Sequence, residues 1–403
     1  MLAEAVRIGG GGGRAWTLNE RGRAASPTPD CQYHPPVMPI VVRTNSALLL
    51  LALACAGAGC GKSEEGAPTL TKVSALGEVG TSPGQFAFPR ALDTDGSSLW
   101  VIDKAGRVQR FDLKTGKCVE YWGMPKTEFG KPTGVTAFAG DPPLLFIPDT
   151  HYQRVMVFKV EPLPEKPVEG TKMREAPAPL TMFGKRGRGP GEFIYPTDIA
   201  ILPTEDGKKP ARLYIAEYGD NDRVSIYEPD GAGGYVFKSS FGTWGSSEDN
   251  PGDPTAVVFN RPQSISLDLT RRELIVADAG NHRLGRFTLD GTLIKWVGAR
   301  TPKDESPVHY PWALQALGDG TAIVVEQVAA RLQRIDLTTG ESLGIFGGPG
   351  PKLGQFATPW AIAVTGSRMY IADGGNNRVV VSELPPIIHH TVAHAGGKAG
   401  ETR

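Results

Sequence analysis

The chain has 403 residues, and its 43 Lys and Arg balance 43 Asp and Glu, so the formal net charge is zero. It contains 51 Gly and 34 Pro while 40% of its residues are hydrophobic, a composition too apolar for a disordered chain and too rich in turn formers for a helical bundle. The lack of a basic excess argues against a nucleic-acid partner, because nucleic acids are held mainly by a basic surface.

Residues 1–37 show no periodic apolar pattern. They contain a glycine run at 9–13, scattered Arg and several prolines between residues 27 and 36. A segment of this composition cannot bury an apolar face, so we expect a disordered extension. Met38 then opens a segment with the features of a genuine start, which leaves open whether residues 1–37 are translated.

Residues 38–60 have the arrangement of a secretory signal, with an apolar run at 47–54 followed by small residues up to Cys60. The run is too short to cross a bilayer as a permanent helix. A Cys at this place resembles the lipobox of bacterial lipoproteins, whose Cys becomes the first residue of the mature protein and carries the lipid. The resemblance implies lipidation of Cys60, with Cys55 as the competing site and a plain cleaved signal peptide as the alternative. We therefore expect a bacterial cell-envelope protein that is membrane-anchored only through its lipid, or a secreted protein.

Six similar segments occupy residues 61–384. Each begins at a Pro followed by a short apolar run, and the six prolines are Pro89, Pro132, Pro196, Pro262, Pro311 and Pro359. A Phe lies three residues before five of them, at Phe86, Phe129, Phe193, Phe259 and Phe356, while the fifth segment has Val308 there. Each segment continues with an apolar run ending in an acid, a polar turn, a second run opened by a basic residue, and in most segments a third run ending near Gly. This order predicts four strands per segment.

A four-stranded sheet cannot bury both of its faces alone, and radial stacking of such sheets closes them into a propeller. We expect the Phe before each Pro to fill the wedge between neighbouring sheets. The last segment stops after its third strand, whereas an unassigned run at 70–77 precedes the first segment and is predicted to complete the sixth sheet. The prediction is an all-β, six-bladed β-propeller of four-stranded antiparallel blades, closed by an N-terminal strand. We expect the insertion at 161–179 to project from the second blade as a loop, and residues 385–403 to form a disordered tail.

The segments resemble the NHL repeat. Runs such as LIVAD and MYIAD followed by GNHR or GNNR carry this resemblance, which extends over residues 70–384 and is strongest at 262–287 and 359–382. The fifth segment lacks the Gly-Asn, and the first is one residue short between Asp103 and Arg107. The resemblance implies a six-bladed propeller, and the Gly-His and Trp-Asp punctuation of WD repeats is absent.

An acid and an Arg recur in nearly every segment. Examples are Asp149 with Arg154, Glu217 with Arg223, Asp278 with Arg283, and Asp373 with Arg378. A catalytic constellation would occur once in the chain, so the recurrence indicates ion pairs that stabilise turns.

Function is expected where the segments differ on one shared face. In an up-and-down blade the link between blades lies at one end of the sheets, so the residue after each repeat Pro is predicted to lie near the mouth of the central channel. These residues and one neighbour form the predicted ligand-binding face: Arg90, Thr133, Thr197, Asp198, Gln263, Trp312 and Trp360. A mixed aromatic and polar mouth suits a protein, a peptide or a glycan. The alternative is that both Trp side chains only fill the wedge between blades.

The predicted function is a non-enzymatic binding or interaction scaffold, monomeric and without a metal, a cofactor or catalytic residues. The alternative is a metal-dependent propeller lyase or lactonase. Peptidyl-hydroxyglycine lyase propellers, which this architecture resembles, hold zinc through His residues from different blades. Here His151, His282 and His309 occur at unequal offsets, so we expect no converging trio. We also find no Glu, Asn and Asp calcium set of the gluconolactonase type.

Overall fold

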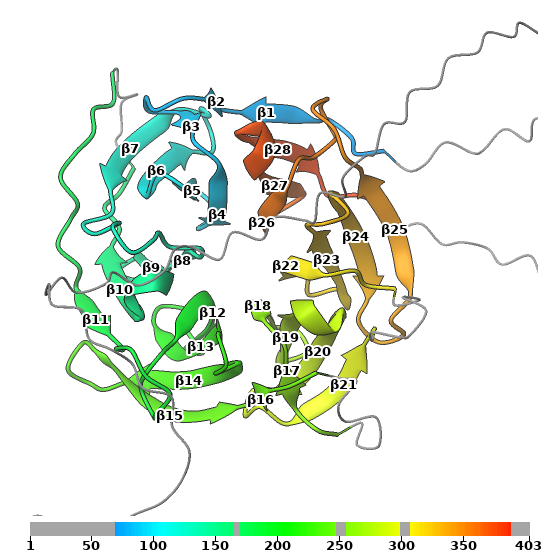
Figure 1. Ribbon diagram of the computed structural model, residues 1–403. Coiled ribbons are helices and arrows are strands. Elements are labelled where there is room, and N and C mark those ends of the chain that lie inside the picture. The colour runs from blue at the N-terminus through cyan, green and yellow to red at the C-terminus, as the bar shows by residue number, and fades with distance from the viewer. Residues whose placement is uncertain (1–68, 164–169, 247–254, 299–306, 388–403) are drawn as a thin grey trace, which may run out of the picture. The chain divides into compact units, whose positions relative to one another are not determined.

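The computed structural model describes residues 69–163, 170–246, 255–298 and 307–387, so the predictions for residues 1–37, 38–60 and most of 385–403 lie outside it. Within this part, six four-stranded antiparallel sheets lie around a central axis (Figure 1). The colours follow the chain once around the ring, so that the last blade lies beside the first. The fold is the predicted all-β propeller of six blades.

Each blade runs from an inner strand to an outer strand. Blades one to three comprise β4 (Pro89–Thr94), β5 (Ser98–Asp103), β6 (Arg107–Asp112) and β7 (Cys118–Gly123); β8 (Thr136–Phe138), β9 (Leu144–Asp149), β10 (Arg154–Lys159) and β11 (Thr181–Phe183); and β12 (Tyr195–Pro203), β13 (Pro210–Tyr218), β14 (Arg223–Pro229) and β15 (Tyr235–Phe241). Blades four and five comprise β18 (Pro262–Asp268), β19 (Glu273–Asp278), β20 (Arg283–Thr288) and β21 (Leu293–Val297); and β22 (Pro311–Ala316), β23 (Thr321–Glu326), β24 (Arg331–Asp336) and β25 (Ser342–Gly347). Blade six comprises β26 (Pro359–Thr365), β27 (Arg368–Asp373), β28 (Arg378–Glu383) and β1 (Ser74–Leu76).

The burial of the strands follows from the stacking of the blades. Every residue of β5, β9 and β23 is buried, because neighbouring sheets cover both faces of the second strand. Such strands read as continuous apolar runs rather than alternating ones. The outer strand β15, by contrast, is largely exposed. Within the described ranges, no helix has the length and apolar character needed to span a membrane.

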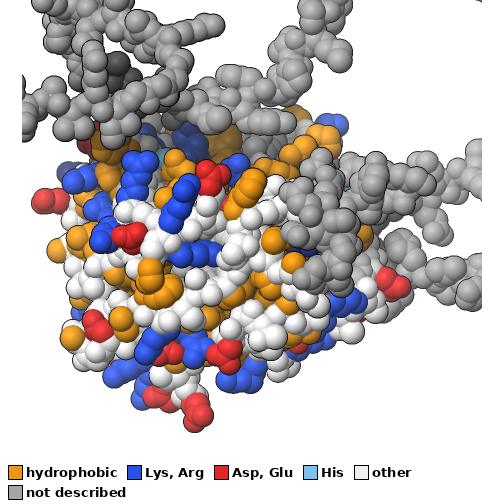
Figure 2. All heavy atoms as spheres, turned by 60° about the horizontal axis from the view of Figure 1, so that its bottom comes forward, with side chains coloured by type: hydrophobic (Ala, Val, Ile, Leu, Met, Phe, Trp, Pro, Cys, Tyr) orange, Lys and Arg blue, Asp and Glu red, His pale blue; other side chains and the backbone are white. Residues whose placement is uncertain are grey.

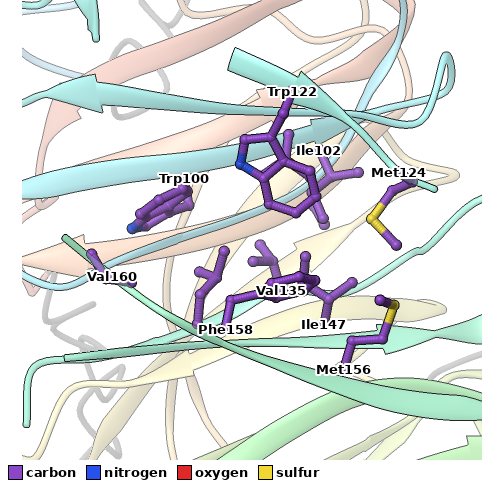
Figure 3. Close-up of a cluster of buried hydrophobic side chains, with 12 residues drawn as sticks. Trp100, Ile102, Trp122, Met124, Val135, Ile147, Met156, Phe158 and Val160 are labelled. Carbon is purple, nitrogen blue, oxygen red and sulfur yellow. The ribbon is translucent and has the colours of Figure 1, made fainter. Parts of the chain in front are cut away.

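Apolar clusters fill the wedges between blades. Between blades one and two, the rings of Trp122 and Phe158 lie 5.1 Å apart between centroids, and Trp100, Ile147 and Met156 pack in the same cluster (Figure 3). Burial of such side chains, at about 25 cal/mol per Å² of apolar surface, is the main force that holds the blades together.

The wedge prediction is confirmed at most positions and wrong at one. The fully buried side chains are those of Phe86, Phe193, Phe259, Phe356 and Val308. Phe129 is 77% exposed, and its ring contacts Tyr152 instead. The reason is that Trp122, from the outer strand of blade one, occupies the wedge that Phe129 was predicted to fill.

Strands from both ends of the propeller meet in blade six. β1 pairs antiparallel with β28, and Leu76 lies opposite Val379. The N–H of Glu383 donates to the carbonyl of Thr71 at 3.1 Å, which continues the contact beyond the strand. This pairing covers the edge that β28 would otherwise expose.

The described end of the 161–179 insertion does not project as predicted. Arg174 forms a parallel bridge with Trp122, and its N–H donates to the carbonyl of Tyr121 at 2.8 Å. The Thr171 hydroxyl donates to the carbonyl of Cys118 at 2.7 Å. The segment lies along the outside of β7 (Figure 1) because the outer strand of blade one offers unpaired backbone groups that it satisfies.

Candidate functional site

The recurring acids and Arg residues tie five of the six blades to the link that precedes them. In blade two, Asp149 accepts from Arg154, and its Oδ1 makes no hydrogen bond within the described residues. The buried acids of the six pairs are Asp103, Asp149, Glu217, Asp278, Glu326 and Asp373. In blade four, Asp278 accepts hydrogen bonds from the N–H of Asn260 at 2.7 Å and from Arg283 Nε at 2.8 Å. Arg283 also donates to the carbonyl of Val258 at 2.7 Å. These groups hold the turn and the link together, which agrees with the predicted structural role.

The inner strands enclose a cavity of about 290 Å³ on the axis. Neighbouring inner strands are bridged by side chains: Thr136 donates to the carbonyl of Ile199 at 2.8 Å, and Ser264 donates to Asp198 at 2.7 Å. Asp93 accepts from the N–H of Ala137 at 2.8 Å. These polar groups are engaged in joining blades, so they position the walls of the channel.

The structure brings most of the predicted residues together. Six of the seven predicted residues are among those that line the cavity: Thr133, Thr197, Asp198, Gln263, Trp312 and Trp360. Arg90 does not line the cavity, but its guanidinium carbon lies 5.1 Å from the centroid of the Trp360 ring. Thr197 is buried and donates to the carbonyl of Ala216 at 3.1 Å, and the Thr133 hydroxyl lies 2.8 Å from that of Thr150. Both threonines therefore have structural partners.

The two Trp side chains from neighbouring blades meet at the channel mouth. The Trp312 and Trp360 ring centroids are 4.8 Å apart, with the rings near perpendicular. Arg90 covers Trp360 on one side of this pair. The guanidinium of Arg261 lies 4.8 Å from the Trp312 ring on the other side, and 4.6 Å from the ring of Tyr218.

Two further rings complete this group. Tyr310 stacks beside Trp312 with centroids 5.9 Å apart, and Phe88 meets Trp360 edge-on at the same distance. We call the whole group the aromatic–arginine rim, and its members are Phe88, Arg90, Tyr218, Arg261, Tyr310, Trp312 and Trp360.

The sequence analysis missed four members of the rim. Phe88, Arg261 and Tyr310 each directly precede a repeat Pro, and all three have left-handed backbones, with φ of 59°, 62° and 47°. This conformation is uncommon for bulky residues and persists only where surrounding contacts hold it. The preceding blade supplies such contacts, since Phe88 N–H donates to Asn377 Oδ1 at 2.8 Å. The available signal was the recurrence of large side chains one step before Pro.

The wedge alternative for the two Trp side chains holds only in part. Trp360 packs against the core cluster between blades six and one, and Trp312 is only 5% exposed. However, Trp360 keeps exposed surface, and both rings contact cationic side chains at the mouth rather than apolar ones alone. Trp360 Nε1 and Arg90 Nε are buried and make no hydrogen bond within the described part of the chain.

Two of the three weighed His residues approach each other. His282 and His309 have ring centroids 6.3 Å apart, whereas His151 lies against Tyr195. Across the described ranges, no group of three or more His, Cys, Asp or Glu side chains is placed to hold a metal ion.

Comparison with known proteins agrees with the fold. Residues 259–287 match the NHL repeat, and no curated protein matches the chain. A protein of unknown function from Bacteroides thetaiotaomicron is 15% identical, with 77% of this chain and 75% of that chain covered and a TM-score of 0.50. A catalytically inactive virginiamycin B lyase from Staphylococcus aureus, solved with quinupristin, is 17% identical over 78% of this chain and 88% of that chain, with a TM-score of 0.44. The first likeness speaks for the fold alone at so low an identity, and the second, with a TM-score of 0.44, adds nothing to it. The chain is a six-bladed β-propeller with an NHL repeat in its fourth blade.

Proposed function

We propose that the protein is a non-enzymatic binding scaffold that receives an extended segment of a partner protein at the aromatic–arginine rim. The observation that carries the proposal is the contact of Trp312 and Trp360, each covered by an Arg. Trp, Tyr and Arg contribute most of the binding energy in protein interfaces, because they combine large apolar surfaces with directed donors. Six of the rim residues lie at or directly before the starts of inner strands and Tyr218 ends β13, so binding orders little of the protein.

The chemistry of the rim favours a peptide over a glycan. A sugar ring binds aromatic side chains by stacking on an open face. Here guanidinium groups lie over Trp360, Trp312 and Tyr218, and Tyr310 stacks beside Trp312. What remains available is the exposed part of Trp360 and the terminal N–H groups of Arg90 and Arg261, which suit the carbonyl and side-chain groups of a peptide.

The proposal includes export and lipid anchoring at Cys60 or at Cys55, both of which lie outside the described residues. One acyl chain anchors only marginally, whereas two or more hold a protein stably. From Cys60, residues 61–73 reach at most about 45 Å when fully extended, which would keep the propeller near the membrane. A mass spectrum of the mature N-terminus tests the anchor, and an unmodified terminus elsewhere would remove it from the proposal.

Peptide selection on the purified full chain tests the binding role. A random peptide library is displayed and selected, and recovered peptides are synthesised and titrated. Trp312→Ala and Trp360→Ala should each weaken binding about tenfold or more, because both rings lie at the centre of the rim. Trp244→Ala is the matched control, since Trp244 is 59% exposed and lies outside the rim.

Thermal unfolding of every variant separates lost binding from lost folding, and Trp→Phe substitutions keep a ring at each site if the Ala variants do not fold. Equal peptide binding by wild type and both Trp variants would exclude the rim as the site. Stoichiometric zinc or calcium in the purified protein would favour the metal-dependent lyase or lactonase instead.

A further inference from the structure

We infer that the partner segment is acidic, and that Arg90 and Arg261 each bind one of its carboxylates, on either side of the Trp312–Trp360 pair. This inference rests on the proposed binding role of the rim and adds the chemical class of the ligand. It is carried by the unused hydrogen-bonding capacity of the two guanidinium groups.

Arg90 makes no hydrogen bond and no ion pair to any described residue, although the guanidinium group has five N–H donors. Its Nε is buried, and its contact with the Trp360 ring holds the group in place. Burial lowers the pKa of Arg90, which means that its charge is incompletely solvated in the free protein. An Arg held in this way is prepared to accept a carboxylate, since the bidentate geometry of the two groups matches.

Arg261 repeats the arrangement at the link between blades three and four. Its Nε donates to Gln263 Oε1 at 3.1 Å, while its two terminal nitrogens make no hydrogen bond within the described part of the chain. The rings of Tyr218 and Trp312 both lie within 5 Å of its guanidinium carbon, at 4.6 and 4.8 Å. The side chain is therefore fixed in position by packing while its outer donors remain unused.

The charges around the rim favour an anionic ligand. Lys104 lies 5.9 Å from the Phe88 ring and adds a third positive charge. Of the acids nearby, Asp103 is paired with Arg107, whereas Asp222 accepts only the backbone N–H groups of Gly219 and Arg261. The three cations therefore outnumber the one of these acids that has no ion pair within the described residues. The side of the propeller in Figure 2 differs, because there Lys and Arg side chains are interspersed with Asp and Glu.

Hydration at the open mouth is the simpler explanation of free Arg donors. Water would satisfy the terminal nitrogens of an Arg in any orientation. Hydration therefore does not explain why two guanidinium groups are held over a pair of touching Trp rings. The fixed geometry reduces the entropy lost on binding, which is what a recognition site needs.

The test is titration of fluorescently labelled, capped hexaglutamate with the full chain, followed by anisotropy and Trp fluorescence. Arg90→Gln and Arg261→Gln should each weaken binding about tenfold, and capped hexaglutamine should not bind measurably. Arg90→Lys keeps the charge but loses the planar fork, so it should recover only part of the affinity. Arg368→Gln is the matched control, because Arg368 is exposed at the start of β27, at the opposite end of the sheets, and should leave binding within about twofold.

Each outcome has a defined meaning. Hexaglutamate binding that neither Gln variant weakens, while both variants unfold at the wild-type temperature, would overturn the inference. Binding of hexagalacturonate at the rim without binding of hexaglutamate would assign the carboxylates to an acidic glycan and would also overturn it. Selected peptides that bind the rim equally well after amidation of every carboxylate would refute the acidic ligand but leave the binding role intact. Failure of all selected peptides to respond to the Trp variants would refute the binding role itself.

Discussion

Replacing Asp278 with Ala should be among the most destabilising single changes in this propeller. Asp278 is fully buried and accepts hydrogen bonds from Asn260 N–H, Asn281 Nδ2 and Arg283 Nε at 2.7 to 2.8 Å. Its removal leaves Arg283, itself only 6% exposed, without a counter-charge beside the Trp296 ring. Breaking a buried pair by removing one partner costs about 3–5 kcal/mol, so we expect a loss of that size in the free energy of unfolding.

Asp278→Asn should cost less than Asp278→Ala. Burial raises the pKa of Asp278 to about 6, and the charge and hydrogen bond of Arg283 offset this only in part. The carboxylate is therefore poorly solvated near neutral pH, and an amide relieves that penalty while still accepting the N–H of Asn260. We expect a loss of about 1–3 kcal/mol for the Asn variant.

Urea unfolding followed by Trp fluorescence measures these losses. Asp373→Ala is the matched control, because Arg378 of that pair still donates to the carbonyls of Pro351 and Lys352 in exposed positions. It should cost less than Asp278→Ala. A loss below about 1 kcal/mol for Asp278→Ala, or a larger loss for Asp373→Ala, would refute the view that these pairs act through burial.

Three further predictions concern the channel, the wedges and blade six. Burial raises the pKa of Asp93 to about 7, above its unfolded value, so the contribution of Asp93 to stability is lost as pH rises through about 7. Asp93→Asn should remove this pH dependence and raise the free energy of unfolding by about 2 kcal/mol at about pH 8, measured by urea unfolding. An equal gain at about pH 5 would contradict the prediction. Phe193→Ala should lower the free energy of unfolding by about 3–5 kcal/mol and Phe129→Ala by less than about 1 kcal/mol, because the first ring is fully buried and the second is 77% exposed. Similar losses in the two variants would show that exposure does not decide the cost. Deleting residues 70–77 removes β1 and so uncovers the edge of β28. The deletion should therefore lower the thermal midpoint by several degrees and cause self-association, seen by size-exclusion chromatography. A monomer with an unchanged midpoint would argue that β1 contributes nothing to blade six.

The number of blades and the turns between strands could be predicted because their causes are local. A Pro opens four of the six inner strands and lies within four residues of the start of the other two. An acid and an Arg flank each turn between the second and third strands, so the repeat itself specifies where the chain reverses. The pairing of Asp278 with Arg283 needs only residues five apart on one hairpin. Such features are repeated six times, which is why a pattern in one sequence was enough.

The path of the links was not predictable in the same way. Phe129 occupies the same step of the repeat as the buried Phe193, yet Trp122 takes its place in the wedge. The insertion between β10 and β11 of blade two returns along β7, because the backbone edge of that strand offers partners that the repeat pattern does not show.

The sequence by itself determined the all-β class, the sixfold repeat and the position of each inner strand relative to the channel, since these follow from periodicity and turn chemistry. Only the tertiary structure decided that Tyr218, Arg261, Trp312, Trp360 and Arg90 form one continuous group. These side chains come from five different blades, counting Arg261 with blade four, and left-handed backbones before the prolines turn three of the rim residues toward the mouth. Periodicity specifies which end of a blade a residue occupies, but contacts between blades depend on the size and direction of side chains far apart in the chain.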